Sequence, residues 1–418
     1  MARRSPRAQL GRPSQHDARA SAALEAAAEV LNRDGLSKAS LASVAKALRI
    51  SKSALYYYFK NKEELVYKCY LKTCHKSLGC VIKAASFPGN GCEQLRQYLI
   101  LQLNAPATAF VSDINFLNSD HQREIRTLAR QHDGYLQKIL ATGQNDHSLA
   151  SASCELVNFA IVGTINWMHI WEPLQKGAGQ RSEVAAAFVD LFLFGLRPRG
   201  SSGAGPQIAP VELDKQELFS ESVFDREYLA AQRRESILRA ATEFFNRTGF
   251  DNCSLAEIVE SLNVTAGALY HYVDSKEELL FECYQRSLDL TEEVLNRIAA
   301  EPGSGLQKLL RFVASIIELN AGPHRPLASY FRLKSLTVTH QKEIRSRDRR
   351  MTHKFNFLKL GVEDGSIRTE VDPALAKLAL VGALNWIPKW YSRSGRATPP
   401  EVRHAFCTLF SDGLVPRS

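Results

Sequence analysis

The sequence SLASVAKALRISKSALYYYFKNKEEL, residues 40–65, decides the fold because the chain contains it twice. Residues 254–279 read SLAEIVESLNVTAGALYHYVDSKEEL, and the two stretches align without a gap, with 12 of 26 positions identical. The offset of 214 residues is too long for the stacked units of a solenoid. We therefore interpret the 418-residue chain as two whole copies of one architecture, duplicated and fused.

The sequence of each copy predicts a helix-turn-helix. Apolar residues recur at i, i+3, i+4 and i+7, which is typical of a helix with one buried stripe. These stripes are Leu41, Val44, Ala45 and Leu48 in the first copy and Leu255, Ile258, Val259 and Leu262 in the second. Ser40 and Ser254 precede them as candidate N-caps. A second, shorter helix follows, with Leu55 and Phe59, or Leu269 and Val273, as its buried residues.

The second helix leaves small, basic and tyrosine side chains exposed. They are Lys52, Ser53, Tyr56 and Tyr57 in the first copy and Ala266, Gly267, Tyr270 and His271 in the second. Small residues at the start of such a helix let its backbone approach base edges in the major groove. Tyrosine hydroxyls and a lysine bond phosphate oxygens. The alternative interpretation is an ordinary helical hairpin whose tyrosines cap a core.

The same residues resemble a known family. The pattern Ser/Thr-x-x-x-Leu-Tyr-x-Tyr-(Phe/Val)-x-(Asn/Ser)-Lys-Glu-x-Leu follows an Ala-rich helix and a Gly, and is similar to that of TetR-type bacterial transcription regulators. The resemblance implies a double-stranded DNA partner and an all-α fold. The candidate DNA-binding residues are Ser40, Lys52, Ser53, Ala54, Tyr56, Tyr57, Lys62, Ser254, Ala266, Gly267, Tyr270, His271 and Lys276.

Charge distinguishes the two copies. The whole chain has a net charge of +9, which favours a nucleic-acid partner. Residues 40–64 have a net charge of +3, whereas the equivalent residues 254–278 have a net charge of −4. Phosphate contacts dominate DNA affinity, so the second copy is expected to bind more weakly unless neighbours such as Arg233 and Arg234 compensate.

Composition and motifs argue against several other classes of protein. No apolar run approaches the ~20 residues that span a bilayer, and the basic N-terminus lacks the apolar segment of a secretory signal. We therefore expect a cytoplasmic protein with no membrane partner. The eight cysteines show no Cys-x-x-Cys pair, which favours buried reduced thiols over a metal or redox site. With no phosphate loop, nucleophile elbow or His-Glu metal motif, we predict no enzymatic activity and no cofactor.

The predicted organisation is all-α, with two tandem TetR-like units. Each unit has a three-helix head followed by a helical effector and dimerisation bundle. The predicted segments are a basic flexible arm at 1–16, a first helix-turn-helix domain at 17–65, a first effector/dimerisation domain at 66–197, a linker at 198–227, a second helix-turn-helix domain at 228–279 and a second effector/dimerisation domain at 280–415. The arm either enters the minor groove or is a solvated tail.

The repeat continues beyond the heads. Residues 121–126 match 340–345, and 163–171 match 382–390, now at an offset of 219. Five residues have therefore been gained, and we expect them in the loop 321–326.

The family resemblance implies that the last two helices of each copy build a four-helix interface. These helices are expected at 155–171 with 184–196, and at 375–391 with 401–414. We expect one chain to form this interface internally, as a pseudo-dimer, because fusion removes much of the entropic cost of association. A chain that dimerises further, as a homodimer, is the alternative.

A Gly-x-x-Asn-Trp-x-x-x-Trp signature occurs in both copies. It resembles the subgroup of TetR repressors of fatty-acid and sterol breakdown that release DNA on binding an acyl-CoA. The candidate ligand-binding residues are Asn166, Trp167, Trp171, Arg349, Asn385, Trp386 and Trp390. Tryptophans four residues apart share a helix face, and such a pair more often belongs to a core than to a ligand site. Arg126, Arg130, Arg345 and Arg349 serve either an anionic ligand or a solvated face.

The function predicted from these observations is that of a ligand-responsive transcriptional regulator of the repressor type, acting on an asymmetric operator because the heads differ. The alternative is a regulator in which only the first head binds DNA. The second copy is then a ligand-binding or protein-interaction module.

Overall fold

The computed structural model describes residues 15–105, 108–111, 113–171, 181–200, 208–213, 226–250, 254–262, 273–322, 324–326, 333–392, 395 and 397–417. Within these ranges the regular elements are helices, with no strand. The all-α prediction is confirmed. None of the helices in the described part of the chain is long and apolar enough to cross a bilayer.

The first copy contains eight α-helices and one 3-10 turn in its described residues. They are α1 (Gln15–Lys38), α2 (Leu41–Leu48), α3 (Lys52–Tyr56), α4 (Lys62–Ala85), α5 (Gly91–Leu103), η1 (Ile114–Phe116), α6 (Ser119–Asn145), α7 (Cys154–Trp171) and α8 (Arg181–Phe194). Local sequence sets several of these bounds. Side chains of Ser40, Asn61 and Asn90 accept bonds from first-turn amides, and Gly35, with φ 77°, interrupts α1 near its end.

The second copy repeats this order. Its described elements are α9 (Arg226–Thr248), α10 (Leu255–Leu262), α12 (Lys276–Ala300), α13 (Gly305–Ala321), η3 (Leu333–Ser335), α14 (Val338–Lys354), α15 (Phe357–Glu363), α16 (Pro373–Trp390) and α17 (Pro399–Asp412). Helix α13 starts at the position equivalent to the start of α5 but is four residues longer. Most of the inserted residues therefore lengthen α13 by one turn. They do not lie in the loop 321–326, where we expected them.

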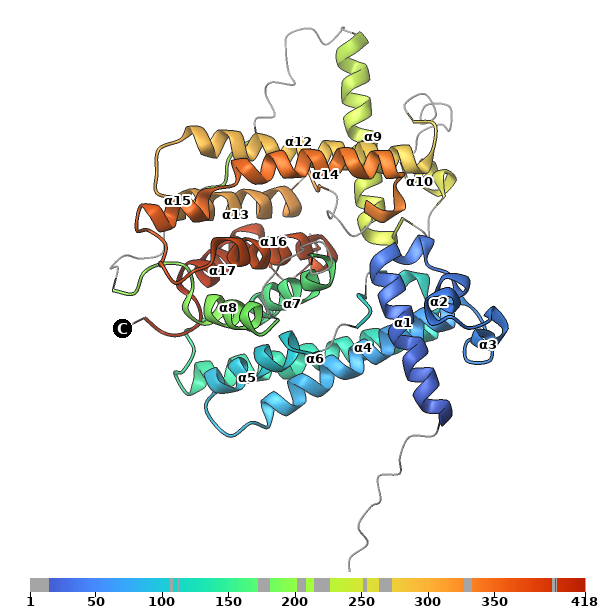
Figure 1. Cartoon of the computed structure of the whole chain (residues 1–418). Helices are drawn as coiled ribbons and strands as arrows, with labels where there is room; N and C mark the ends of the chain where they lie inside the picture. The colour runs from blue at the N-terminus through green and yellow to red at the C-terminus, as the bar shows by residue number, and fades with distance from the viewer. Residues whose placement is uncertain are drawn as a thin grey trace, which may run out of the picture.

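The bundle helices form three layers (Figure 1). Helices α7, α8, α16 and α17 lie in the middle, with α4, α5 and α6 on one side and α12, α13, α14 and α15 on the other. Both heads, containing α1–α3 and α9–α10, lie at the same end of the bundle. The middle layer places the last two helices of the first copy against those of the second.

Helices α7 and α16 approach each other through a pair of glycines. A Cβ on Gly163 would lie 2.7 Å from the Cβ of Trp386, and a Cβ on Gly382 would lie 2.6 Å from that of Trp167. The two contacts are equivalent under the repeat. Only a residue without a side chain permits this close approach.

The ends of α8 and α17 are also joined reciprocally. The backbone N–H of Leu196 donates to Phe410 at 2.9 Å, and that of Leu414 donates to Phe192 at 3.0 Å. Further out, Ala150 donates to Leu414 at 2.7 Å, and Arg368 donates to Leu196 at 2.8 Å. Each bond has its mate under the repeat, which is the pattern of a two-fold, isologous contact.

Three of the described cysteines are buried free thiols. Burial raises the pKa of Cys69, Cys283 and Cys407 to about 12 in each case. The thiolate is the reactive form, so at pH 8 only about one thiol in 10⁴ is ionised at such a site. We expect iodoacetamide to label these three thiols only after unfolding. The half-buried Cys80 and Cys92 are internal controls, and mass spectrometry of the digested protein locates the label. Rapid labelling of Cys69 in the folded protein would contradict this prediction.

Candidate nucleic-acid interface

The first head is built by short-range capping. Ser40 Oγ accepts from the backbone N–H of Ser43 at 3.1 Å, and Ser43 Oγ accepts from the backbone N–H of Ser40 at 2.9 Å. Arg49 then takes a left-handed conformation, φ 55°, and turns the chain. Ser51 caps α3 by accepting from the N–H of Ala54 at 3.1 Å. The angle between α2 and α3 therefore depends on residues at or between their ends.

Helix α3 presents the predicted DNA-facing side chains to solvent. Leu55 is fully buried and anchors the helix, whereas Tyr56 is 45% exposed and Tyr57 is 75% exposed. Lys52, Ser53 and Ala54 are exposed as well. This exposure contradicts the alternative in which these tyrosines cap a core.

A hollow of about 270 Å³ opens beside α3. It is lined by Ser40, Leu41, Ala42, Lys52, Tyr56, Lys60, Asn61 and Lys62. Three lysines and the N-termini of α2 and α4 face one space, and no carboxylate is among these lining residues. Amide groups at helix N-termini and lysine ammonium groups both favour a phosphate. We name this hollow the phosphate groove.

The phosphate groove brings together four residues that the sequence predicted: Ser40, Lys52, Tyr56 and Lys62. It also adds Lys60 and the N-terminus of α4, which the sequence reasoning missed. The available signal was Asn61 three residues before Glu64, because Asn61 Oδ1 accepts from the Glu64 N–H at 2.8 Å and so caps α4.

The second head differs at the equivalent place. Ser254 shares its capping box with Glu257, whose Oε2 accepts from the Ser254 N–H at 2.6 Å and from its Oγ at 2.9 Å. These hydrogen bonds lower the pKa of Glu257. A carboxylate therefore stands at the N-terminus of α10, where the first head has Ser43.

Other candidates in the second head are placed less favourably for DNA or lie outside the description. Lys276 Nζ donates to the Phe250 carbonyl at 2.8 Å and lies 4.4 Å from the centre of that ring. Arg234 pairs with Glu282, and Arg233 is exposed. Four of the predicted residues lie outside the described residues: Ala266, Gly267, Tyr270 and His271.

The predicted ligand-binding tryptophans lie where the two copies meet. Trp167 is buried against Gly382, the Trp386 ring lies 6.5 Å from that of Phe110, and Trp390 stacks on Phe159 at 4.3 Å. The side chain of Trp171 is outside the description. Asn166 and Asn385 are half-buried. Arg126, Arg130, Arg345 and Arg349 are all exposed, as expected of a solvated face.

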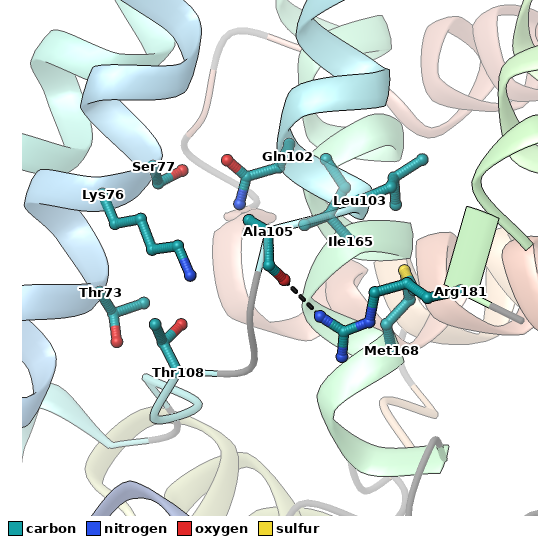
Figure 2. Close-up of a pocket in the computed structure, with 10 residues that line it drawn as sticks. All are labelled: Thr73, Lys76, Ser77, Gln102, Leu103, Ala105, Thr108, Ile165, Met168 and Arg181. Atoms are coloured by element: carbon teal, nitrogen blue, oxygen red, sulfur yellow. Dashed lines mark hydrogen bonds between the residues drawn. The ribbon is translucent and has the colours of Figure 1, made fainter. Parts of the chain in front are cut away.

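A separate cavity lies inside the first bundle, between α4, α5, α7 and α8 (Figure 2). It leaves about 20 Å³ of free space, room for about one water molecule, and opens in part to solvent. The lining residues are Thr73, Lys76, Ser77, Gln102, Leu103, Ala105, Thr108, Ile165, Met168 and Arg181. None of the seven predicted ligand-binding residues is among them. We name this space the first-copy cavity.

A family model described as "Bacterial regulatory proteins, tetR family" matches residues 23–68 and 237–283. A second, described as "Tetracyclin repressor-like, C-terminal domain", matches residues 93–196 and 302–414. The chain belongs to the TetR family. Both models match twice and in the same order, so the predicted tandem arrangement of TetR-like units is confirmed.

TetR-family relatives cover one copy each. The transcriptional repressor KstR2 of Rhodococcus jostii is 27% identical over 189 residues, which are 44% of this chain and 91% of the relative. KstR2 of Mycolicibacterium smegmatis is 25% identical over 190 residues, 44% of this chain and 92% of the relative. These relatives are transcription regulators rather than enzymes. The predicted DNA-binding, repressor-type TetR regulator is supported.

Solved TetR structures show the same coverage. The ketosteroid regulator KstR2 of Mycobacterium tuberculosis is 22% identical, with a TM-score of 0.39, over 44% of this chain and 95% of that one. AibR, solved with isovaleryl coenzyme A and operator DNA, is 22% identical, with a TM-score of 0.37, over 43% of this chain and 98% of that one.

Proposed function

We propose that this chain is a ligand-responsive transcriptional repressor that acts as an intramolecular pseudo-dimer on an asymmetric operator. The observation that carries the proposal is the first head, where Lys52, Ser53, Tyr56 and Tyr57 are exposed, and where Lys52 and Tyr56 line the phosphate groove. Helix α3 enters the major groove, and the phosphate groove holds the adjacent backbone. In domain terms, 17–65 and 228–279 are the two heads, and 66–197 and 280–415 are the effector and dimerisation bundles.

The reciprocal contacts between α7 and α16 and between α8 and α17 support the pseudo-dimer. The glycine contacts and the four backbone hydrogen bonds described above come in matched pairs, as in a two-fold dimer of separate chains. Covalent linkage makes association of the copies intramolecular, so the reading heads are held together at any protein concentration. Homodimerisation of the whole chain is the competing arrangement, and the stoichiometry of the complex distinguishes it.

The second head supports operator asymmetry. Glu257 places a negative charge at the helix end that faces DNA in the first head. This observation also favours a second candidate function, in which only the first head binds DNA and the second copy is a ligand-binding or protein-interaction module.

Footprinting distinguishes the two functions. For the pseudo-dimer we expect protection of two half-sites of unequal sequence. We also expect Glu257→Ser combined with Asp274→Lys to raise operator affinity by about tenfold or more, since it removes two negative charges from the second head and adds a positive one. Protection of one half-site only, with no change in the double variant, would support the second candidate. A perfect palindrome protected equally on both sides would contradict the pseudo-dimer.

An internal connection supports ligand-responsive release. Residues 108–111 and 113–117 belong to the segment between α5 and α6, and Thr108 lines the first-copy cavity. The Asn32 side chain of the first head clamps this segment, donating to the Thr108 carbonyl at 2.8 Å and accepting from the Phe110 N–H at 2.8 Å. Asn115 Nδ2 donates to the Arg247 carbonyl of the second head at 3.0 Å. The segment therefore contacts the cavity and both heads.

We propose that an effector opens the first-copy cavity as it binds, shifts this segment and so changes the spacing of the heads. Recognition of two half-sites requires a fixed separation, so a small change lowers affinity for the operator. An acyl-CoA is the effector class to test, because the TetR-family protein AibR was solved with isovaleryl coenzyme A.

Asn32 provides a test of this coupling. We expect Asn32→Ala to bind the operator within about threefold of the natural protein, but to lose most of the effector-dependent release, because the segment is no longer clamped to the first head. Operator affinity is measured by fluorescence anisotropy with and without isovaleryl-CoA as the first effector tested. The matched control is Asn246→Ala, at the equivalent position of the second copy, where the side chain donates to the Pro326 carbonyl at 3.0 Å. Full release by Asn32→Ala would contradict the proposed route.

A further inference from the structure

We infer that Lys334 of the second copy positions the first head, and thereby sets the spacing of half-sites that the protein accepts. This role rests on the proposed function and deepens it, by naming the residue that fixes one head relative to the opposite copy. Lys334 lies in η3, outside both heads. It is therefore a positioning residue and no part of the DNA-reading surface described above.

Two lysines join the first head to the second copy. Lys334 Nζ donates to the Asn32 carbonyl of α1. In the other direction, Lys38 Nζ at the end of α1 donates to the Leu336 carbonyl, directly after η3, at 3.0 Å. The bonded residues are 302 and 298 positions apart in the chain. We name this pair of bonds the lysine bridge.

The end of α1 is suited to receive an ammonium group. Gly35, with φ 77°, interrupts the helix, and carbonyls in the turn before a helix end lose their intrahelical donor. A cation there satisfies a carbonyl and interacts favourably with the helix dipole. A Cβ on Gly35 would lie 3.3 Å from the Cβ of Lys334, so the lysine stem lies against the bare glycine. Burial lowers the pKa of Lys334, and the Asp34 carboxylate opposes that shift.

The second head is held at the same place by a weaker group. Asn115 is equivalent to Lys334 under the repeat. Its Nδ2 donates to the carbonyls of Arg247 at 3.0 Å and Thr248 at 3.4 Å, at the end of α9. Each copy therefore holds the head of the other. The first head receives a charged donor and the second a neutral amide, and charge-assisted hydrogen bonds are the stronger kind.

The lysine bridge adds to the attachment of the first head to its own copy. There α1 packs on α4, and Lys72 bonds Glu25 at 3.0 Å. A turn of α1 about α4 would break the lysine bridge. A head held by both copies is preorganised for one separation of half-sites, whereas a head held by its own copy alone adapts to several.

Operator duplexes with altered spacing test this role. One base pair inserted or deleted between the footprinted half-sites changes their separation by about 3.4 Å and their relative orientation by about 35°. We expect the natural protein to bind both altered duplexes about tenfold or more weakly than the natural operator, measured by fluorescence anisotropy. Lys334→Met keeps an apolar stem against Gly35 but loses the ammonium. We expect it to bind the natural operator about fivefold more weakly and to lower the spacing discrimination to about threefold or less.

A second variant and a matched control accompany this measurement. Lys38→Met removes the other bond of the lysine bridge and should lower the discrimination as well, so the test stands even if thermal unfolding shows that Lys334→Met is not folded. The control is Lys308→Met. Lys308 Nζ donates to the Ala299 carbonyl near the end of α12 at 3.2 Å, a bond of the same kind within one copy, and its loss should leave the discrimination unchanged. A duplex carrying the first half-site alone should bind Lys334→Met within about twofold of the natural protein.

Full spacing discrimination in the folded variants would overturn the positioning role. An equal loss of affinity on every duplex, the single half-site included, would also overturn it, because that is the result of a merely structural role. If the natural protein itself binds all spacings equally, the heads are not held as a pair, and the proposed pseudo-dimer fails together with the role of Lys334. If the natural protein discriminates and the variants discriminate as well as it does, only the role of Lys334 fails.

Discussion

Replacing Tyr56 by Phe and Lys62 by Met in the first head will weaken operator binding on the order of a hundredfold. Each change removes a group at the phosphate groove, and hydrogen bonds to a charged partner contribute about 1.5–3 kcal/mol each. The methionine keeps an apolar chain beside Phe116, over which the Lys62 ammonium lies at 5.4 Å. Packing of the head is therefore preserved.

The matched pair in the second head is Tyr270→Phe with Lys276→Met. We expect it to weaken binding by less than about tenfold, since Glu257 opposes phosphate there and Lys276 is bonded to the Phe250 carbonyl. Fluorescence anisotropy across a salt series measures both pairs. The first pair should also reduce the slope of log affinity against log salt by about one. Lys83→Met, which changes an exposed lysine at the far end of α4, controls for net charge. Equal losses from both pairs would contradict the asymmetry of the heads.

Replacing Gly163 by Ala will destabilise the protein by about 1–3 kcal/mol, because the added methyl overpacks the crossing of α7 and α16. Its Cβ would lie 2.7 Å from the Cβ of Trp386 and 3.1 Å from the backbone of Ala383. The mate of this change, Gly382→Ala, should cost a similar amount, since its Cβ would lie 2.6 Å from the Cβ of Trp167.

The control for this pair is Gly79→Ala in α4. A Cβ at Gly79 meets no atom within 4 Å, and alanine is favoured in a helix, so we expect stabilisation of about 0.5–1 kcal/mol. Urea unfolding monitored by circular dichroism gives the free energy of unfolding of each protein. If both Gly163→Ala and Gly382→Ala were neutral, the close approach of the two copies would be absent in solution.

Much of the fold was predictable because its signals are local. Helix α12 spans Lys276–Ala300 because Ser275 caps its start and Pro302-Gly303 follows its end. The buried Leu55 and Phe59 and the exposed Tyr56 and Tyr57 follow from helical periodicity alone. The family pattern then identified what the exposed face contacts.

The first-copy cavity was not predictable in the same way. Lys76, Gln102 and Arg181 come from three different helices, so no spacing in the sequence connects them. The tryptophans of α7 and α16 show the opposite problem. An aromatic pair at i, i+4 occurs in cores more often than in ligand sites, and only the crossing at Gly163 and Gly382 places Trp167 in a packed contact.

The central claim is that one chain supplies both halves of the DNA-binding unit. Native mass spectrometry of the protein bound to a duplex carrying its footprinted operator tests it directly. The account predicts one chain of 46.6 kDa per duplex, at protein concentrations well above the dissociation constant. A complex with two chains on a single operator, and none with one, would contradict it.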